Sequence, residues 1–296
     1  MTDTADPLAV LFDRIAALVD GAAPSIVAVQ AGRRWPISGI HWRPGIIVTA
    51  EEALEGDDDL SVLLPDGRRL AAALAGRDPS TDVAVLRFQP DGLRVAQIGD
   101  AAKLRPGHLA LVVGRHDSGV MASHGIVGLA GSAWQSRRGG TIDQLLRLDL
   151  RLSPGAQGGA LVDVAGTVLG MAVLGPRRRA LAIPASTIDR AVDQLLLKGH
   201  VSRGYLGAGL QPVRLGGDDS ARGVLVVSID AAGPAAAAGL LVGDVITHWN
   251  GAPVSRVRAV MRLLGTESAG TKADLALLRA GSPASLSVTL GERPLA

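Results

Sequence analysis

Short apolar runs, each ended by glycine, proline or aspartate, fill most of the chain and restrict what it can fold into. Between Pro24 and about Ile183 these runs are rich in Val, Ile and Leu and too short for long helices. The whole sequence holds 38 Gly and 16 Pro but only four Trp, two Phe and one Tyr. The pattern predicts a mainly β body of two small packed barrels. The nine predicted strands are Ser25–Gln30, Gly45–Thr49, Leu60–Leu64, Val83–Phe88, Leu109–Val113, Gly125–Leu129, Leu145–Leu150, Thr167–Val173 and Ala180–Ile183.

Two segments have helical spacing of their apolar residues. Pro7–Val19 predicts a short amphipathic helix that packs on its own domain or serves a subunit interface. Pro184–Lys198 predicts a second helix, with Ser186 or Thr187 as its N-cap. Its apolar face comprises Ile188, Ala191, Val192 and Leu195.

A separate unit of about 90 residues follows Gly199–Arg203, and its length suits one small α+β domain. Its predicted strands are 223–229, 244–249, 273–279 and 284–290, and its predicted helix is Val257–Leu264.

The charge pattern and the first residues exclude several classes of partner. Thirty Lys and Arg against 28 Asp and Glu leave a net charge of only +2, and the arginine run 177–179 lies beside a proline, as an exposed turn would. A nucleic-acid-binding surface would gather its charges, so we predict no nucleic-acid partner. Met1–Pro7 has no basic residue, and Asp13 and Arg14 interrupt the apolar stretch behind it. We therefore expect neither a signal peptide nor a membrane span, and a cytoplasmic location.

Several short sequence motifs occur in an order that resembles one known protein family. Taken together from Pro24 onward, they resemble the HtrA/Deg-type, trypsin-like serine proteases that carry a C-terminal PDZ domain. The resemblance implies a chymotrypsin-like double β-barrel followed by a small α+β PDZ domain. The implied domains are an N-terminal helix (1–22), a trypsin-like domain (23–199) and a PDZ domain (200–296). The phrases lie at 65–68, 76–86, 98–107, 125–127, 182–184, 203–207, 238–246 and 250–251.

The resemblance also locates the family's catalytic positions. Its Gly-Asn-Ser-Gly-Gly turn matches Gly155–Gly159, which places Gln157 at the nucleophile's position. Its histidine follows a strand and matches Glu52, and its aspartate matches Asp82. An amide is neither nucleophile nor base, and acyl transfer by this design needs a hydroxyl and an imidazole. We therefore predict a pseudoprotease that is not an enzyme, in which the glycines still shape the turn of an oxyanion hole.

Two other roles are conceivable for residues near these catalytic positions: a cation site and a replacement catalytic triad. Glu52 and Asp82 form a candidate carboxylate pair for a hard cation, with help from Gln157. Two carboxylates and one amide are few ligands, so we predict no metal and no cofactor. A replacement triad would need Ser153 and one of His41, His108, His116 or His124, which we place in or beside loops.

The PDZ resemblance implies peptide binding. PDZ domains add an extended peptide to a sheet edge, and a glycine-containing loop receives the peptide's C-terminal carboxylate. Tyr205, Leu206, Gly207 and Ala208 match that loop, and Val257, Met261 and Leu264 would line the groove from the helix, unless they are core residues. The nearby Arg256, Arg258 and Arg262 favour acidic tails.

The expected function is therefore that of an adaptor, assembly factor or chaperone that binds polypeptide C-terminal segments. The resemblance also implies a homotrimer, and a hetero-complex is the alternative assembly. Two alternatives remain open at this stage: a structural subunit that uses the barrel surface, and residual hydrolysis through another nucleophile.

Overall fold

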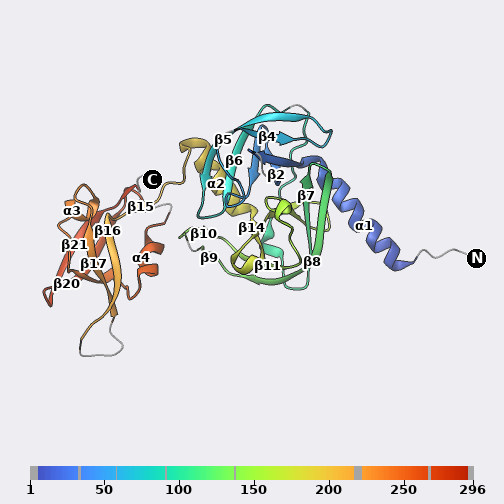
Figure 1. The fold of residues 1–296 in the computed structure, drawn as a ribbon. Helices are drawn as coiled ribbons and strands as arrows, with labels where there is room; N and C mark the ends of the chain where they lie inside the picture. The colour runs from blue at the N-terminus through green and yellow to red at the C-terminus, as the bar shows by residue number, and fades with distance from the viewer. Residues whose placement is uncertain are drawn as a thin grey trace, which may run out of the picture. The chain divides into compact units, whose positions relative to one another are not determined.

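The computed structural model describes residues 6–32, 35–57, 59–90, 92–136, 138–216, 222–265 and 268–292. The first five and last four residues of the predicted domains lie outside that description. The chain divides into two compact units, Met1–Val201 and Ser202–Ala296. Both are built mainly from antiparallel strands (Figure 1).

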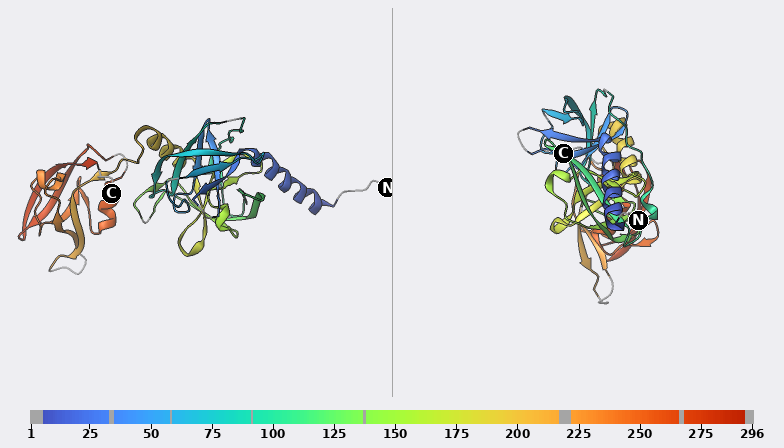
Figure 2. Two further views of the ribbon diagram at one scale, coloured as in Figure 1. Left: turned by 45° about the horizontal axis from the view of Figure 1, so that its top comes forward. Right: turned by 90° about the vertical axis from the view of Figure 1, so that its right-hand side faces the viewer.

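Two closed six-stranded barrels form the first unit, as the sequence predicts (Figure 2). Each strand pairs antiparallel with its neighbours, so neither barrel leaves a sheet edge unpaired along its full length. The first barrel runs in the order β1 (Ile26–Ala31), β2 (Ile37–Arg43), β3 (Ile46–Thr49), β6 (Val83–Phe88), β5 (Arg69–Asp78) and β4 (Leu60–Leu63). The second runs in the order β11 (Leu145–Asp149), β14 (Ala180–Pro184), β13 (Val168–Leu174), β12 (Ala160–Val162), β7 (Leu109–His116) and β8 (Gly119–Gly131).

Three barrel strands were not predicted, namely β2, β5 and β12. β2 is buried on both faces and contains Gly39, where a Cβ would lie 2.7 Å from the Val29 side chain. β5 is alanine-rich, and β12 has only three residues. Each lacks the run of Val, Ile and Leu that signals a strand, so the barrel closure around them decides their conformation.

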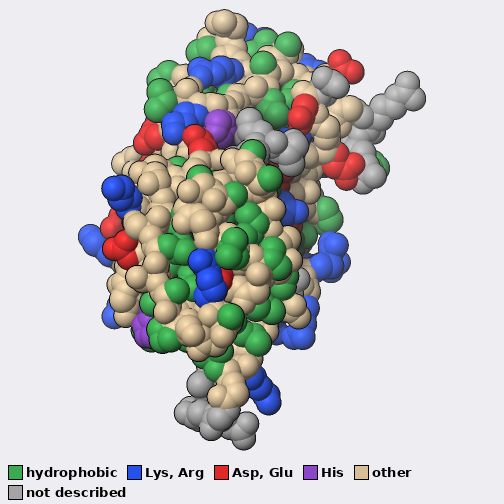
Figure 3. Space-filling view, turned by 90° about the vertical axis from the view of Figure 1, so that its left-hand side faces the viewer, with side chains coloured by type: hydrophobic (Ala, Val, Ile, Leu, Met, Phe, Trp, Pro, Cys, Tyr) green, Lys and Arg blue, Asp and Glu red, His purple; other side chains and the backbone are tan. Residues whose placement is uncertain are grey.

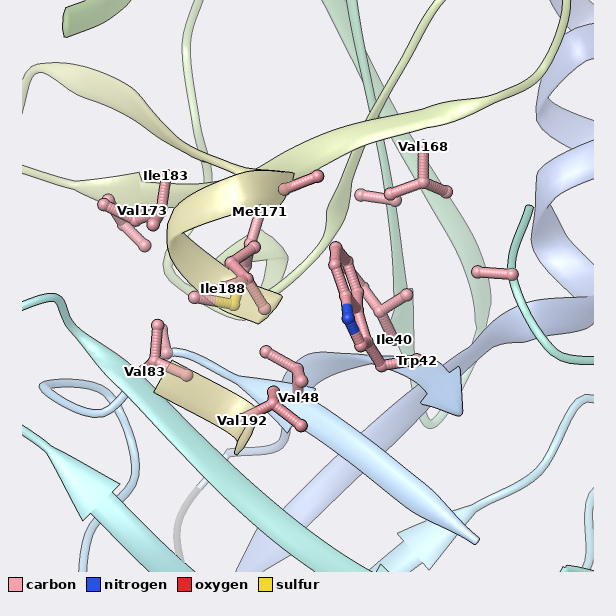
Figure 4. Close-up of a cluster of buried hydrophobic side chains, with 14 of the residues drawn as sticks. Ile40, Trp42, Val48, Val83, Val168, Met171, Val173, Ile183, Ile188 and Val192 are labelled. Atoms are coloured by element: carbon pink, nitrogen blue, oxygen red, sulfur yellow. The ribbon is translucent and has the colours of Figure 1, made fainter. Parts of the chain in front are cut away.

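The main core of the first unit lies between the barrels (Figure 4). Trp42 from β2 lies close to Ile40 in this cluster, with Met171 of β13 and Ile188 of α2 (Ala185–Lys198) nearby. The indole N–H of Trp42 donates to Asp189 at 2.8 Å. α2 therefore packs its apolar face into the core that both barrels share, and its predicted apolar residues are all buried.

The predicted cap of α2 is wrong. Its N-cap is Pro184, and no side chain caps the helix. The Ser186 hydroxyl instead donates to Asp143 at 2.7 Å, and the Thr187 hydroxyl accepts the Asp143 backbone N–H at 2.9 Å. The two hydroxyls hold the segment before β11 against the helix, which the local sequence pattern does not reveal.

α1 (Pro7–Ala22) is the predicted amphipathic helix, extended by three residues. Ile15, Leu18 and Val19 pack against the first unit's core, whereas Leu8, Leu11 and Phe12 on the outer half are exposed. The short turn η1 (Ala23–Ser25) leads from α1 into β1. The backbone carbonyls of Ala23 and Ile26 accept hydrogen bonds from the buried guanidinium of Arg115.

The second unit holds a six-stranded sheet, a separate two-stranded sheet and two short helices. Its apolar core is separate from that of the barrels and includes Trp249, Val260 and Leu275. The buried Asp244 carboxylate accepts hydrogen bonds from Arg279 and from the Leu241 N–H, which ties the start of one strand to the end of its direct neighbour. The sheet order is β16 (Ala208–Arg214), β17 (Arg222–Ile229), β18 (Val245–Trp249), β20 (Lys272–Arg279) and β21 (Ser282–Thr289). The remaining elements are β15 (Gly204–Tyr205), β19 (Ala252–Pro253), β22 (Gly291–Glu292), α3 (Pro234–Ala237) and α4 (Val257–Leu263).

Two surface properties complete the description. Within the described residues, no helix is both long and apolar enough to cross a membrane. On the face of the molecule shown in Figure 3, lysine and arginine side chains are scattered among acidic, hydrophobic and polar ones. That face has no continuous basic patch.

Candidate functional sites

The turn that contains Gln157 lies between the two barrels' strands. It follows the short helix η3 (Pro154–Ala156), and Ser38 of β2 donates its backbone N–H to the Gln157 carbonyl at 2.9 Å. The Gln157 side chain folds back on its own barrel: its amide nitrogen lies 3.4 Å from the Pro154 carbonyl, and its amide oxygen lies 3.4 Å from the Leu174 N–H. The amide therefore bridges the turn to the end of β13.

Two glycines are required by the close packing of this turn. Gly158 has φ +82°, and a Cβ there would lie 2.0 Å from the Ser38 carbonyl oxygen and 2.7 Å from the Thr49 hydroxyl. A Cβ on Gly159 would lie 2.7 Å from the Val113 carbonyl oxygen. Both positions exclude a side chain by backbone contact, so the turn itself needs these glycines.

Three backbone N–H groups at the end of the turn donate hydrogen bonds within the barrel. Gln157 donates to Pro154 at 3.2 Å, Gly158 to Ala172 at 2.9 Å and Gly159 to Ala156 at 3.0 Å. An oxyanion hole needs donors that point at a developing charge. In the described conformation the short helical turn takes up the Gln157 N–H, and the oxyanion-hole shape of this turn stays a prediction.

Glu52 and Asp82 do lie together, as the resemblance implies. The Glu52 backbone N–H donates to the Asp82 carboxylate at 2.7 Å. The Glu52 side chain is half exposed and faces Arg138, with 3.8 Å between their charged atoms. No hydrogen bond or ion pair joins Gln157 to either acid, all three being described residues. The structure thus brings two of the three positions into contact and leaves the third beside β2.

Asp82 has an unusual environment. Its backbone is left-handed, with φ +58°, a conformation that Asp tolerates better than most residues. Burial raises the pKa of its carboxyl to about 7, the hydrogen bond from Glu52 opposes the rise, and the negative charges of Glu52 and Glu51 add to it. Near neutral pH this carboxyl is therefore protonated in part of the molecules.

Two arginines to which the sequence assigned no role at this site hold the acidic segment in place. Arg138 reaches Glu51 at 3.4 Å, and Arg77 binds Glu51, the Leu54 carbonyl and Asp57. Residues 138 and 77 are far from 51 in the sequence, so no local pattern signals the cluster. Among the described residues, no group of three or more His, Asp or Glu side chains is placed to hold a metal ion.

Of the histidines considered for a replacement triad, His108 lies in the loop before β7 and His116 ends β7 beside a turn, as predicted, whereas His41 and His124 lie within strands. His41 lies within β2, where it is buried between the Arg94 carbonyl and the Gly45 N–H, and burial lowers its pKa. His116 and His124 lie in β7 and β8. Ser153 is exposed and precedes η3. No hydrogen bond links Ser153 to any of these described histidines.

In the second unit, the predicted carboxylate loop joins β15 to β16. Gly207 has φ +75°, and a Cβ there would lie 3.1 Å from the Gly233 Cα, so the position needs glycine. The carbonyls of Leu206 and Gly207 accept N–H groups of Ala235 and Asp230. The loop is therefore held in place by hydrogen bonds to its backbone carbonyls.

β16 begins at this loop and is an edge strand of the sheet. In the described part of the chain it pairs with β17 alone, so its other edge is available for a further strand. α4 contacts β16. Of the predicted lining residues, Leu206 and Leu264 are buried in the core, Tyr205, Ala208 and Val257 are half-buried, and Met261 is 37% exposed.

Comparison with known proteins identifies both units. A model of the trypsin-like peptidase domain matches residues 37–171, and a model of the PDZ domain matches residues 204–290. The fold therefore defines a trypsin-like peptidase domain followed by a PDZ domain. More specifically, the chain is homologous to the HtrA/DegP serine endoproteases.

Individual relatives support this assignment. The probable periplasmic serine endoprotease DegP-like of Halomonas elongata is 34% identical over 84% of this chain and 55% of that protein. Its counterpart in Brucella suis is 34% identical over 84% of this chain and 51% of that protein. The HtrA-type protease AlgW, solved with a decapeptide, is 26% identical with a TM-score of 0.79, over 95% of this chain and 99% of that one. The chain spans about half the length of the curated relatives it matches.

The comparisons overturn two predictions. The prediction that the chain is not an enzyme is contradicted, because the relatives that match 84% of it are named serine endoproteases. That prediction was based on positions 52 and 157 alone, whereas the similarity covers both domains. The predicted cytoplasmic location is also contradicted, because these relatives are named periplasmic. It relied on the first residues of a chain that spans only part of its relatives.

Proposed function

We propose that this chain recognises the C-terminal segment of another polypeptide, which adds as a strand beside β16 of the PDZ domain. One observation carries the proposal: β16 ends its sheet, with a glycine-containing loop at its start and α4 beside it. Backbone hydrogen bonds along such an edge provide affinity, and pockets for alternate side chains provide specificity. The chain would act as an adaptor, assembly factor or chaperone for polypeptides.

The relatives agree with this proposal in two respects. Structures of HtrA-type proteases similar to this chain were solved with a decapeptide and with a tripeptide. The relatives named periplasmic serine endoproteases support the periplasm as the place where this chain works. A homotrimer or a hetero-complex remains a prediction.

Substitution of Met261 in the full chain tests whether the groove binds the peptide. Met261 and Leu263 are 37% and 38% exposed on α4, and helical spacing places Met261, but not Leu263, on the stripe with Val257 and Leu264. We expect Met261→Gln to weaken binding of a labelled peptide with an apolar C-terminal residue about five-fold or more, since burying a large apolar side chain is worth about 1.5–3 kcal/mol. Fluorescence anisotropy provides the affinity.

Leu263→Gln is the matched control and should leave the affinity within about two-fold. Amidation of the peptide's C-terminus should abolish binding, because the loop N–H groups then lose their carboxylate. Equal binding of the free and amidated peptides would show that the groove is not the binding site. Retained capture of a partner protein by Met261→Gln would favour the barrel surface instead.

The relatives also favour endopeptidase activity as a second candidate function. Attack on a peptide bond needs a nucleophile, and the amide of Gln157 is not one. Ser153 is the exposed hydroxyl nearest to the turn in the sequence. Under this second candidate, the full chain would use a hydroxyl outside position 157.

Hydrolysis of an unfolded protein such as reduced casein tests this second function. We expect Ser153→Ala to lower the rate by about 100-fold or more, as removal of a nucleophile does, and to remove labelling by a fluorophosphonate. Gln157→Ala should leave the rate within about three-fold, because its side chain supplies no chemistry. Hydrolysis no faster than in buffer alone would exclude this second function without affecting the peptide-binding proposal.

A further inference from the structure

The polarity of α4 relative to the carboxylate loop determines how a bound peptide must pass the helix. The Gly204 N–H donates to the Gly265 carbonyl at 3.2 Å, and a Cβ on Gly204 would lie 3.4 Å from the Leu264 Cα. The C-terminal end of α4 therefore lies beside the start of the loop at Tyr205. The N-terminal end of α4, at Val257, lies farther from the loop, about 9 Å away along the helix axis.

A peptide whose carboxylate is received by the loop must run antiparallel to β16. β16 starts at the loop with Ala208 and leaves it toward Arg214, whereas the peptide ends there. The residues upstream of the peptide's C-terminus therefore pass α4 from its C-terminal end toward its N-terminal end. They meet Arg262 first and Arg258 next.

The spacing of these two arginines matches alternate residues of a strand. Positions 258 and 262 are four residues apart, on one side of the helix, and so about 6 Å apart along its axis. A strand advances about 3.3 Å per residue, and alternate side chains point the same way. Two side chains at alternate peptide positions are therefore spaced to face one arginine each.

The charged side chains that the structure describes on α4 and β16 are all positive. Arg256, Arg258 and Arg262 are exposed and form no ion pair with a described residue. The described residues of α4 and β16 include no acid, and Arg214 adds a further positive charge at the far end of β16. Asp230, at the opposite side of the loop, is already hydrogen-bonded to the Tyr205 hydroxyl and to the Ala232 N–H. The positive charge therefore lies along the path of the upstream residues.

We infer that the groove selects C-terminal segments that end in an apolar residue and carry acidic residues at two alternate upstream positions, one for Arg262 and one for Arg258. The inference rests on the proposed peptide-binding function and specifies its ligand. The arginines act on selectivity, while the loop and β16 hold the backbone. Exposed ion pairs of this kind are individually weak, so the preference is moderate and sensitive to salt.

Three ten-residue peptides with a free, apolar C-terminus test the inference on the full chain by fluorescence anisotropy. One carries Asp at two alternate upstream positions, one carries Asn there, and one carries the two Asp residues side by side. At low salt we expect the alternate-Asp peptide to bind more tightly than the Asn peptide, with each Asp raising the affinity about two- to five-fold. The adjacent-Asp peptide should gain from one acid only. The preference should shrink at about 0.5 M salt.

Arg258→Gln and Arg262→Gln should each remove about half of the preference, and the double variant all of it. The same charge change in Lys272→Gln, on β20 and separated from β16 by two strands, should leave it unchanged. Unaltered affinity of every variant for the Asn peptide shows that the domain is still folded. Equal binding of all three peptides, or a preference that survives the double variant, would overturn the inference while the proposed function stands. Failure of all three peptides to bind would instead refute the proposed function.

Discussion

At the scale of single residues, Asp82 is the residue that we matched by resemblance to the family's aspartate, and that match stays a prediction. Its carboxylate now accepts a backbone N–H from Glu52, and its neighbours Glu51 and Glu52 are themselves acids. The cost of ionising it within this acidic, partly buried segment makes it a titrating group near neutral pH.

Asp82→Asn should change how the stability of the first unit depends on pH. The folded pKa of about 7 lies above the ordinary value near 3.9, so the folded state binds more protons between these values. The free energy of unfolding of the natural chain should therefore fall as pH rises from about 4 to about 7, and the variant should lose that dependence. At pH 8 we expect the variant to be more stable by about 2–4 kcal/mol.

The measurement is hydrogen exchange over β3 and β6 through a denaturant series at pH 5 and pH 8, corrected for the intrinsic exchange rates. Asn retains the oxygen that accepts the Glu52 N–H and tolerates the left-handed backbone. Asp149→Asn, at an exposed residue of β11, is the control and should keep the natural pH dependence. A variant at position 82 with an unchanged pH dependence would place the titration elsewhere.

At the scale of elements, the turn 155–159 is held by contacts with the other barrel. Gly158 packs against Ser38 and Thr49, and the Gln157 carbonyl accepts the Ser38 N–H. β2, which the sequence pattern does not reveal, is thus the element against which the turn is shaped.

Gly158→Ala should destabilise the first unit much more than Gly166→Ala. Both glycines have similar positive φ values, +82° and +77°, but a Cβ at 166 meets nothing within 4 Å. We expect a loss of about 1–2 kcal/mol for Gly166→Ala from backbone strain alone. Gly158→Ala should lose about 3–5 kcal/mol, because its Cβ also displaces the Ser38 backbone. Guanidinium unfolding followed by hydrogen exchange over β2 and β12 provides both values, and equal losses would contradict the packing argument.

At the scale of the whole molecule, the chain has the order and fold of an HtrA/DegP protein, with two barrels and then a PDZ domain, each with its own core. Sequence similarity over 84% of the chain corrected two predictions made from a few residues. These were that the chain is not an enzyme and that it works in the cytoplasm.

The amino-acid sequence by itself determined which chain segments become strands where Val, Ile and Leu cluster, and the order of phrases that names the family. It also predicted, by resemblance, that positions 52, 82 and 157 match the family's catalytic residues, because their neighbouring phrases are local; that match stays a prediction. Tertiary structure decided what no local pattern encodes. Alanine-rich β5 and three-residue β12 become strands only because the barrel provides their partners. Arg138 meets Glu51 across 87 residues, and packing fixes the polarity of α4 at Gly204. Such contacts depend on distances between segments remote in sequence, which only the closed fold sets.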